Sequence, residues 1–390
     1  MKNLVPKRRF EEFKDSDPWE QRKLGEIYRF QYGKFNVNPS NGGKYPVYGA
    51  NGVIGLYTEF NAEDSIIIGH MGEYAGIVLW GEGRHFVTYN GIITAPRDNK
   101  VNSKFGYYLL QKKNIRQICG GSGQPFLSYE MLDKLQISFP VNSEEQKKIG
   151  TFFTELDTLI TLHQRKLDKV KETKSAYLSE MFPKEGELYP KRRFAGFTDP
   201  WEQRKFSSIA NLRRGLTYKP TDVREKGVIV LRSSNINEDK FVLNKDDDVF
   251  VHEQAVNIDF IKENDILITS ANGSSHLVGK HALVDKMSIK AVHGGFMLAA
   301  SANEPFFVNS LMSSPWYSRF IKTYIAGGNG AIGNLRRSDL EEQIVLVPNE
   351  LEQQKIGTFF QQLDHLITLH QRKLDKLQAL KQAYLSEMFV

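Results

Sequence analysis

The stretch QKKIGTFFTELDTLITLHQRKLDKVKETKSAYLSEMF, residues 146–182, recurs almost unchanged as QQKIGTFFQQLDHLITLHQRKLDKLQALKQAYLSEMF at residues 353–389. Residues 149–182 and 356–389 are identical at 26 of 34 positions, with a constant offset of 207 residues. Neither copy has a Pro or a Gly after its first turn, so each predicts one helix of about 40 residues, about 60 Å long. The rest of the chain is organised around this repeat.

Each copy carries the start signal of a helix and the stripe of a coiled coil. Ser143 with Gln146, and Asn349 with Glu352, fit the N-cap and N3 positions of a capping box, and Pro183 ends the first helix. Apolar residues follow a 4-3 spacing. Because neither helix can bury such a stripe alone, we predict that the two helices pair within the chain and run antiparallel. The predicted seam residues include Phe153, Leu156, Ile160, His163 and Leu167 in the first helix and Phe360, Leu363, Ile367, His370 and Leu374 in the second.

Polar residues interrupt both stripes at matching places. His163 and His370, with Lys174 and Lys381, stand at seam positions, where a polar side chain costs stability and can fix the register. A metal site formed by the two histidines is an alternative, but no cysteine or third ligand lies near them in the sequence. We therefore predict no metal site.

The segments beside the helices repeat as well. PKRRFEEFKDSDPWEQRKL opens the chain at residues 6–24, and PKRRFAGFTDPWEQRKF follows the first helix at residues 190–206, whereas the second helix has no such follower. The N-terminal arm thus supplies what the second helix lacks, so we expect the two ends of the chain to lie close together in a closed, pseudo-twofold arrangement. The predicted parts are an arm at 1–16, a variable domain at 17–142, a long helix at 143–183, an arm repeat at 184–198, a second variable domain at 199–348 and a second long helix at 349–390.

The two variable domains share a thin common pattern. EDSIIIGHMGEYAG at residues 63–76 and ENDILITSANGSSHLVG at residues 263–279 each give a short apolar strand and then a glycine-bearing turn, and both domains later carry Gly-Gly-x-Gly. We expect two diverged copies of one mixed α/β fold. Their loops are rich in Gly, Asn, Ser and Arg, which suit contacts with base edges and phosphates and also suit ordinary turns. The candidate DNA-binding residues are Asn51, Arg84, Gln124, Arg213, Arg214, Lys219, Arg232, Asn235, Asn272 and Asn329.

The composition is that of a soluble globular protein. The 390 residues are 40% hydrophobic and 25% charged, with a net charge of +6. No apolar run approaches the about 18 residues of a membrane span, and the start shows no signal-peptide pattern, so we expect a cytoplasmic location. Cys119 is the single cysteine, which excludes an internal disulfide and predicts an inert, buried thiol.

Sequence motifs of catalysis are missing. The chain has no GxxxxGK[ST] phosphate loop, no HExxH, no GxSxG and no GxGxxG after a strand. No pair of carboxylates stands at a recognisable spacing for acid–base work. We therefore expect no catalytic residue and no cofactor-binding residue in this chain.

Together these features closely resemble the specificity subunits of type I restriction-modification enzymes. The resemblance covers the whole chain and rests on the two near-identical helices, the DPWEQRK segments at residues 17–23 and 199–205, and the proline-led PVNSEEQKKIG and PNELEQQKIG segments. It implies that the variable segments are target recognition domains, each reading half of a split double-stranded DNA sequence. It also implies that the paired helices separate these domains and dock two modification subunits.

The resemblance places the chemistry in the partners. The modification subunits would bind S-adenosylmethionine and methylate adenine at N6. Added restriction subunits would use ATP and Mg to translocate and cut DNA. No membrane partner is implied, and this chain would hold no cofactor of its own.

Outward positions of the helices repeat too, although a coiled-coil seam does not require it. Gln164, Arg165 and Lys166 recur as Gln371, Arg372 and Lys373, and these six residues are our candidates for docking the modification subunits. A recent duplication without constraint on these faces would leave the same pattern. The alternative function is a non-catalytic two-headed adaptor that binds proteins through its variable domains.

Overall fold

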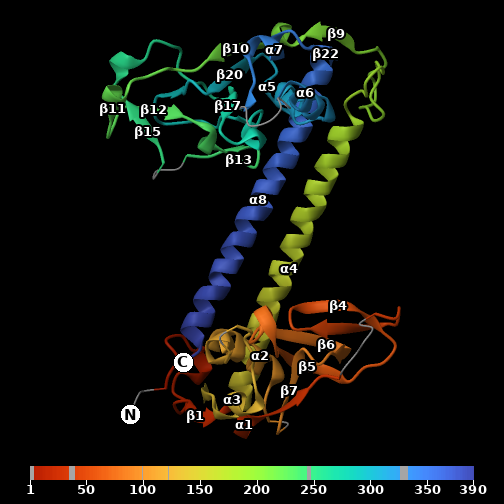
Figure 1. Ribbon diagram of the computed structural model, residues 1–390, viewed down its shortest axis with the longest axis vertical. Helices are drawn as coiled ribbons and strands as arrows, with labels where there is room; N and C mark the ends of the chain where they lie inside the picture. Colours follow the sequence, from red (N-terminus) through yellow and green to blue (C-terminus); the bar gives the residue numbers. More distant parts are fainter. Residues whose placement is uncertain (1–3, 35–39, 99, 122, 244–246, 326–332) are drawn as a thin grey trace. The chain divides into compact units, whose positions relative to one another are not determined.

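The computed structural model describes residues 4–34, 40–98, 100–121, 123–243, 247–325 and 333–390 (Figure 1). The chain divides into two compact units, one formed by residues 1–165 and 371–390 and the other by residues 166–370. Two long helices carry the repeat, α4 (Ser143–Glu180) and α8 (Glu350–Met388), as the sequence predicts. Each unit contains one variable domain and a part of both helices. No helix in the described ranges is both long and apolar enough to cross a membrane.

Within each unit the two helices run antiparallel. As residue numbers rise along α4, those of the facing residues in α8 fall. The contacts that show this are Phe152–Tyr384, with ring centroids 5.1 Å apart, and Asp157–Lys381 at 2.7 Å in the first unit, and Lys174–Asp364 at 2.6 Å and Tyr177–Phe359 at 5.1 Å in the second. The predicted antiparallel pairing is confirmed in both units.

Burial follows the predicted 4-3 stripe. Since the side chains on the stripe turn toward the facing helix, most of them lose their contact with water. The buried members are Phe153, Leu156, His163, Leu167, Phe360, Ile367 and Leu374, and the half-buried ones are Ile160, Leu363 and His370.

The start of α4 differs from the prediction by one residue. Asn142, not Ser143, is the cap: its side-chain oxygen accepts from the backbone N–H of Glu144 at 2.9 Å and of Glu145 at 3.4 Å. Gln146 does not close a capping box, because its amide donates to the carbonyl of Pro140 at 2.9 Å instead.

At α8 the predicted cap is present. Asn349 accepts from the backbone N–H of Glu352 at 3.0 Å. The carboxylate of Glu352 does not return to Asn349, however, because it is held by Arg193. The capping box is therefore only half formed.

The first variable domain is built on a six-stranded sheet in the order β2-β7-β5-β6-β3-β4, antiparallel except between β3 and β6. Helix α2 packs against it, with Phe105 and Leu109 in one core with Ile66 and Ile68. The strands of the sheet are β2 (Tyr28–Tyr32), β3 (Tyr45–Gly49), β4 (Gly52–Tyr57), β5 (Ala62–Gly69), β6 (Val78–Val87) and β7 (Gly91–Pro96). The remaining elements are the paired strands β1 (Glu20–Lys23) and β8 (Gln136–Phe139) and the helices α1 (Leu24–Ile27), α2 (Ser103–Lys113) and α3 (Tyr129–Lys134).

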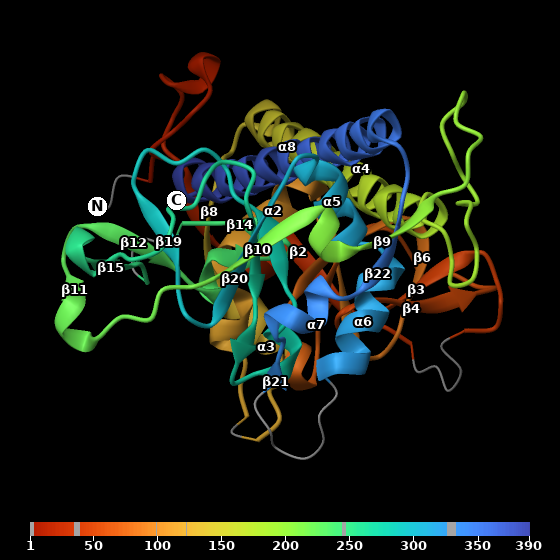
Figure 2. The same cartoon turned by 90° about the horizontal axis from the view of Figure 1, so that it is seen from above.

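The second variable domain has two four-stranded sheets, β10-β20-β16-β18 and β11-β15-β12-β19. Figure 2 shows β10 beside β20. The strands of these sheets are β10 (Ala210–Arg214), β16 (Ile266–Thr269), β18 (His281–Leu283), β20 (Met297–Ala302), β11 (Val223–Arg224), β12 (Val228–Leu231), β15 (Val249–Val251) and β19 (Ala291–His293). The paired short strands are β9 (Glu202–Lys205) with β22 (Ile344–Val347), β13 (Ile236–Asn237) with β14 (Lys240–Phe241) and β17 (Ala271–Asn272) with β21 (Gly333–Asn334), and the helices are α5 (Pro305–Met312), α6 (Pro315–Ile325) and α7 (Arg337–Glu341).

The two domains share one frame, as the sequence predicts. The order β2-β7-β5-β6 in the first domain matches β10-β20-β16-β18 in the second. The parallel pair β3–β6 matches β12–β19, so the long strand β6 is divided into β18 and β19 in the second domain. An equivalent backbone hydrogen bond in each domain shows which residues correspond. Leu127 N–H donates to His70 O at 2.9 Å in the first domain, and Leu335 N–H donates to Ser270 O at 2.7 Å in the second.

The arms join each helix end to its unit. In the first unit Arg8 N–H donates to Glu387 O at 2.9 Å and its guanidinium pairs with the Glu387 carboxylate at 2.6 Å. In the second unit Arg192 makes the same two contacts with Glu180, both at 2.8 Å. The N-terminal arm thus holds the C-terminal end of α8, which confirms the expected closure of the chain.

Candidate nucleic-acid interface

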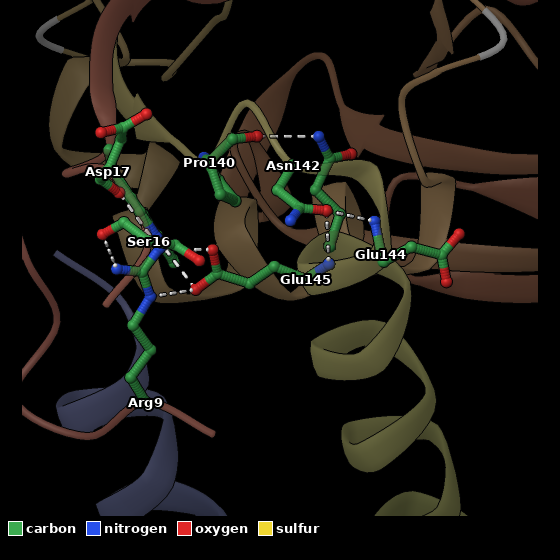
Figure 3. Close-up of polar contacts among 9 residues, drawn as sticks. Arg9, Ser16, Asp17, Pro140, Asn142, Glu144 and Glu145 are labelled. Atoms are coloured by element: carbon green, nitrogen blue, oxygen red, sulfur yellow. Dashed lines mark hydrogen bonds and ion pairs between the residues drawn. The ribbon is translucent and has the colours of Figure 1, made fainter. Parts of the chain in front are cut away.

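A buried ion pair joins the N-terminal arm to the start of α4. Arg9 Nε and Nη2 each donate to one carboxylate oxygen of Glu145 at 2.7 Å, and the guanidinium also donates to Ser16 O at 2.8 Å and Asp17 O at 3.1 Å (Figure 3). Both side chains are almost fully buried. The hydrogen bond to Glu145 raises the pKa of Arg9. A bidentate pair in this setting gives the arm one fixed orientation.

The second unit repeats this pair at matching positions. Arg193 Nε and Nη2 donate to the two carboxylate oxygens of Glu352 at 2.7 Å each, and the Glu352 side chain is fully buried. The hydrogen bond to Glu352 raises the pKa of Arg193. Each arm is therefore attached to the start of a long helix by the same buried ion pair.

Half of the predicted DNA-binding residues lie on the surface. In the first domain Arg84 pairs with Glu63 at 3.4 Å, and its guanidinium carbon lies 4.8 Å from the ring centre of Phe60. Arg214, at the end of β10, faces Leu298 of β20 in the ladder. The exposed predicted residues are Asn51, Arg84, Gln124, Arg214 and Lys219. They remain predictions, and Asn329 lies outside the described residues.

Two predicted contacts serve the fold instead. Arg213 pairs through Nη2 with the buried carboxylate of Asp265. Asn235 is buried, accepts from Arg232 N–H at 2.8 Å and donates to Val242 O at 3.0 Å. As placed, Asn235 is engaged within its own loop and the guanidinium of Arg213 is turned to Asp265, so neither side chain is directed to a base.

The structure brings three predicted residues into one network. The backbone N–H of Arg232 bonds to Asn235, and the guanidinium of Arg232 donates to the carbonyl of Asp247. Asn272 donates to the hydroxyl of Ser233, the residue after Arg232, at 2.9 Å. This network holds the loop after β12 against β17, so these side chains shape the loop.

The helix faces carry a duplicated apolar feature that the sequence analysis missed. Leu159 and Leu162 of α4 are exposed, and so are Leu366 and Leu369 of α8, which stand 207 residues later. All four side chains are between 40% and 51% exposed. The signal was present in the sequence, since these leucines lie off the 4-3 stripe and still repeat.

The docking candidates have matching exposure in the two copies. Gln164 and Gln371 are half-buried, and Gln371 donates to Asp375 at 2.9 Å. The exposed candidates are Arg165, Lys166, Arg372 and Lys373. The two helices thus present the same side chains to solvent.

Reactive groups do not converge in the described parts of the chain. There, no three side chains of His, Cys, Asp or Glu gather closely enough to hold a metal ion. Cys119 is half-buried, and burial raises the pKa of its thiol, which keeps it protonated and weakly nucleophilic at neutral pH.

Comparisons with known proteins identify one family. The family model described as "Type I restriction modification DNA specificity domain" matches residues 16–172 and 198–379. The chain is 20% identical to the type I restriction enzyme MjaVIII specificity subunit of Methanocaldococcus jannaschii, over 94% of this chain and 90% of that protein. It is 27% identical to the StySPI specificity subunit of Salmonella potsdam over 42% of this chain and 37% of that one.

Solved structures show the same fold. The crystal structure of the type I restriction-modification S subunit from M. genitalium aligns with a TM-score of 0.69 at 18% identity, covering 99% of both chains. A chain from a structural study of complex assembly and conformational transition in the type I system aligns with a TM-score of 0.50 at 14% identity, covering 95% of this chain and 97% of that one. The chain belongs to the type I restriction-modification DNA specificity family and is a specificity subunit with two recognition domains.

Proposed function

We propose that this subunit reads a bipartite, asymmetric double-stranded DNA target, with one recognition domain for each half-site. The two domains share the strand order β2-β7-β5-β6 and β10-β20-β16-β18, whereas their loop sequences differ, as in YGANG at residues 48–52 and TSANGSSH at residues 269–276. A common frame gives each domain a similar approach to a DNA groove, while different side chains read different bases. The target is then two short blocks separated by an unread gap, whose length the helices set.

The duplicated leucines carry the second part of the proposal, that two modification subunits dock on the helices. Full burial of a fully exposed leucine contributes about 1.5–3 kcal/mol, and because these four are 40–51% exposed, each would contribute about half of that in a partner interface. Leu159 and Leu162 repeat as Leu366 and Leu369, and the neighbouring Arg and Lys repeat with them. Two equal faces suit two copies of one partner, even though the recognition domains differ.

The catalytic work falls to those partners. The modification subunits bind S-adenosylmethionine and methylate adenine at N6, and restriction subunits, in the full complex, supply the ATP- and Mg-dependent steps. The adenine must leave the base stack, which costs a few kcal/mol. This chain holds the DNA in register for that step and supplies no reacting group.

The test is a reconstitution with the modification subunit of the same host. Binding to a duplex that carries the motif methylated in that host is measured by fluorescence anisotropy between about 50 and 200 mM salt. We expect a preference for this duplex over a scrambled one, and an affinity that falls steeply with salt. A complex that forms but binds both duplexes alike, with no salt dependence, would favour the two-headed adaptor.

A further inference from the structure

We infer that Phe296, at the turn between β19 and β20, contacts a base of the half-site read by the second domain, and that Tyr89, on the matching turn of the first domain, does so at the other half-site. This inference rests on the proposed DNA-reading function. It adds two base-contacting residues, both aromatic and neither with a charge.

Phe296 is unusually exposed. Its side chain is 74% exposed, more than any other large hydrophobic residue in the described ranges. A single exposed apolar residue needs no explanation on most surfaces. Here the turn that carries Phe296 is tightly held by its surroundings, as is the matching turn of the first domain. The exposure of Phe296 therefore needs an explanation.

A glycine lets another strand end pass directly against each turn. A Cβ on Gly215 would lie 1.9 Å from the carbonyl oxygen of Gly294, and a Cβ on Gly33 would lie 2.1 Å from that of Thr88. Both distances are far shorter than any real Cβ keeps from a backbone atom, so only glycine, which has no Cβ, fits at Gly215 and Gly33. The same close approach therefore positions both turns.

Backbone hydrogen bonds fix the tip of each turn. In the second domain Ser270 N–H and Ala271 N–H donate to Phe296 O at 2.9 and 3.1 Å. In the first domain His70 N–H donates to Asn90 O at 2.8 Å. Phe296 corresponds to Asn90 in this pattern, and Tyr89 stands one position earlier. A rigid backbone with a projecting side chain loses little conformational entropy when it binds.

Two exposed arginines stand on backbone segments that neighbour the Phe296 turn. Arg214 is exposed and faces Leu298, two residues beyond Phe296, in the β10–β20 ladder. Arg336 is exposed and follows Leu335, whose N–H donates to Ser270 O at 2.7 Å. An exposed apolar tip with basic residues on neighbouring backbone suits a DNA groove, where phosphates flank the base edges.

The Tyr89 turn has its own chemistry. Tyr89 is 44% exposed, and its ring meets the buried ring of His70 edge-on with centroids 5.4 Å apart. His70 is fixed by a 2.8 Å hydrogen bond between Nδ1 and Leu127 O and by the ring of Tyr32, 4.4 Å away. Lys34, exposed, donates its backbone N–H to Val87 O at 3.0 Å beside the turn. The first domain thus also presents an aromatic tip, with an exposed lysine on the neighbouring backbone.

The side chain of Phe296 limits what it can read. Phenylalanine has no hydrogen-bond donor or acceptor, so it can recognise only a thymine methyl group or the face of a base. Tyr89 adds a hydroxyl group. The two turns are built alike but do not read alike.

The experiment compares Phe296→Ala with wild type in the complex with the modification subunit, on a duplex that carries the host's methylated motif. We expect Phe296→Ala to lose about 5- to 150-fold in affinity for this duplex, the fold-change that corresponds to removing one base–aromatic stack in proteins that bind single strands. The dependence of affinity on salt should not change, since no charge is removed. Phe296→Leu should recover part of the loss if the contact is with a methyl group.

A matched control is Ile289→Ala, an exposed apolar residue before β19, at the other end of that strand from the turn. It should leave affinity unchanged. Replacing each thymine of the second half-site by uracil removes one methyl group at a time, and one such change should weaken the wild type but not Phe296→Ala. If no uracil substitution weakens the wild type selectively, 2-aminopurine is placed at each base step of the second half-site in turn. A rise in its fluorescence at one step with wild type, but not with Phe296→Ala, identifies contact with the face of a base.

The inference is overturned if Phe296→Ala, folded and assembled, binds the motif as tightly as wild type. It is also overturned if the variant loses the modification subunit, because the turn then serves that partner. A wild-type complex without preference for the motif would instead reject the proposed function.

Discussion

Lys174 of α4 and Asp364 of α8 form an ion pair, with Nζ 2.6 Å from Oδ1. The chain makes the same pair a second time, between Lys381 and Asp157 at 2.7 Å. Both lysines interrupt the apolar stripe of their helix, and each is satisfied by a carboxylate from the other helix. A polar residue with one matching partner fixes the register of a helix pair. The exact pairing supports the view that the two helices face each other in the same way in both units.

The first prediction concerns this pair. Asp364→Asn should lower the free energy of unfolding by about 1 kcal/mol or less, because the side chains of Lys174 and Asp364 are 20% and 39% exposed and water screens their attraction. Exchanging the two charges, as Lys174→Asp with Asp364→Lys, should restore most of that loss. The measurement is urea unfolding, and a double exchange no better than the single change would contradict a specific pairing.

The buried ion pairs at the arms should contribute more to the free energy of unfolding than the Lys174–Asp364 pair does. Glu145→Gln leaves the guanidinium of Arg9 buried without its counter-charge, and the expected loss is about 3–5 kcal/mol. Glu352→Gln should cost a similar amount in the second unit. Hydrogen exchange measured at increasing denaturant should show faster amide exchange in the unit that carries the substitution and unchanged exchange in the other unit. The control is Glu26→Gln, which breaks the exposed pair with Arg22 and should cost at most about 0.5 kcal/mol.

The leucine faces predict the stoichiometry of the complex. Leu159→Asp with Leu162→Asp should remove one modification subunit, because two carboxylates cannot be buried in an apolar interface. Leu366→Asp with Leu369→Asp should remove the other, and all four changes should remove both. Native mass spectrometry counts the subunits directly. A full complement of two on the fourfold variant would show that these leucines are not the docking face.

A fourth prediction concerns acid stability. His281 is buried, and loss of hydration lowers its pKa below the ordinary 6.5, against an opposing effect of Asp239 and with a further lowering by Lys174. The unfolded chain therefore takes up this proton first as the pH falls. The stabilisation is present above about pH 6.5 and is lost progressively below it.

The substitution His281→Gln tests whether His281 causes stability to fall as the pH is lowered. Between about pH 7.5 and pH 5.5 the variant should lose less unfolding free energy than wild type, because glutamine takes up no proton. His276→Gln, at an exposed position, should follow wild type. Equal pH dependence in all three proteins would contradict the buried neutral state of His281.

The sequence predicts the helices and their closure because the relevant information is repeated in it. Two copies of one apolar stripe imply that the two helices pair with each other. Two copies of the arm, one before each variable domain, imply that the N-terminal arm packs against the end of the second helix. The N-cap of α4 was misplaced by one residue because Asn142 and Ser143 are both good caps, and only the geometry of the turn after Pro140 decides between them.

The recognition surface was harder to predict. Asn235 and Arg213 have the side chains of base-contacting residues, but burial assigns them to the fold, and no local pattern distinguishes the two roles. Phe296 presents the converse difficulty, because a phenylalanine beside a strand is ordinarily part of a core and nothing local in the sequence marks this one as exposed. Its exposure depends on the path of a strand end that arrives from about eighty residues away, at Gly215.

The most direct test of the account is a map of N6-methyladenine across the host genome with the gene intact, deleted, and altered by exchange of residues 206–348 for the recognition domain of another specificity subunit. The account predicts a split motif that vanishes on deletion and that, after the exchange, changes in one half while the other half and the gap stay the same. A motif that survives deletion, or an exchange that changes both halves, would contradict it.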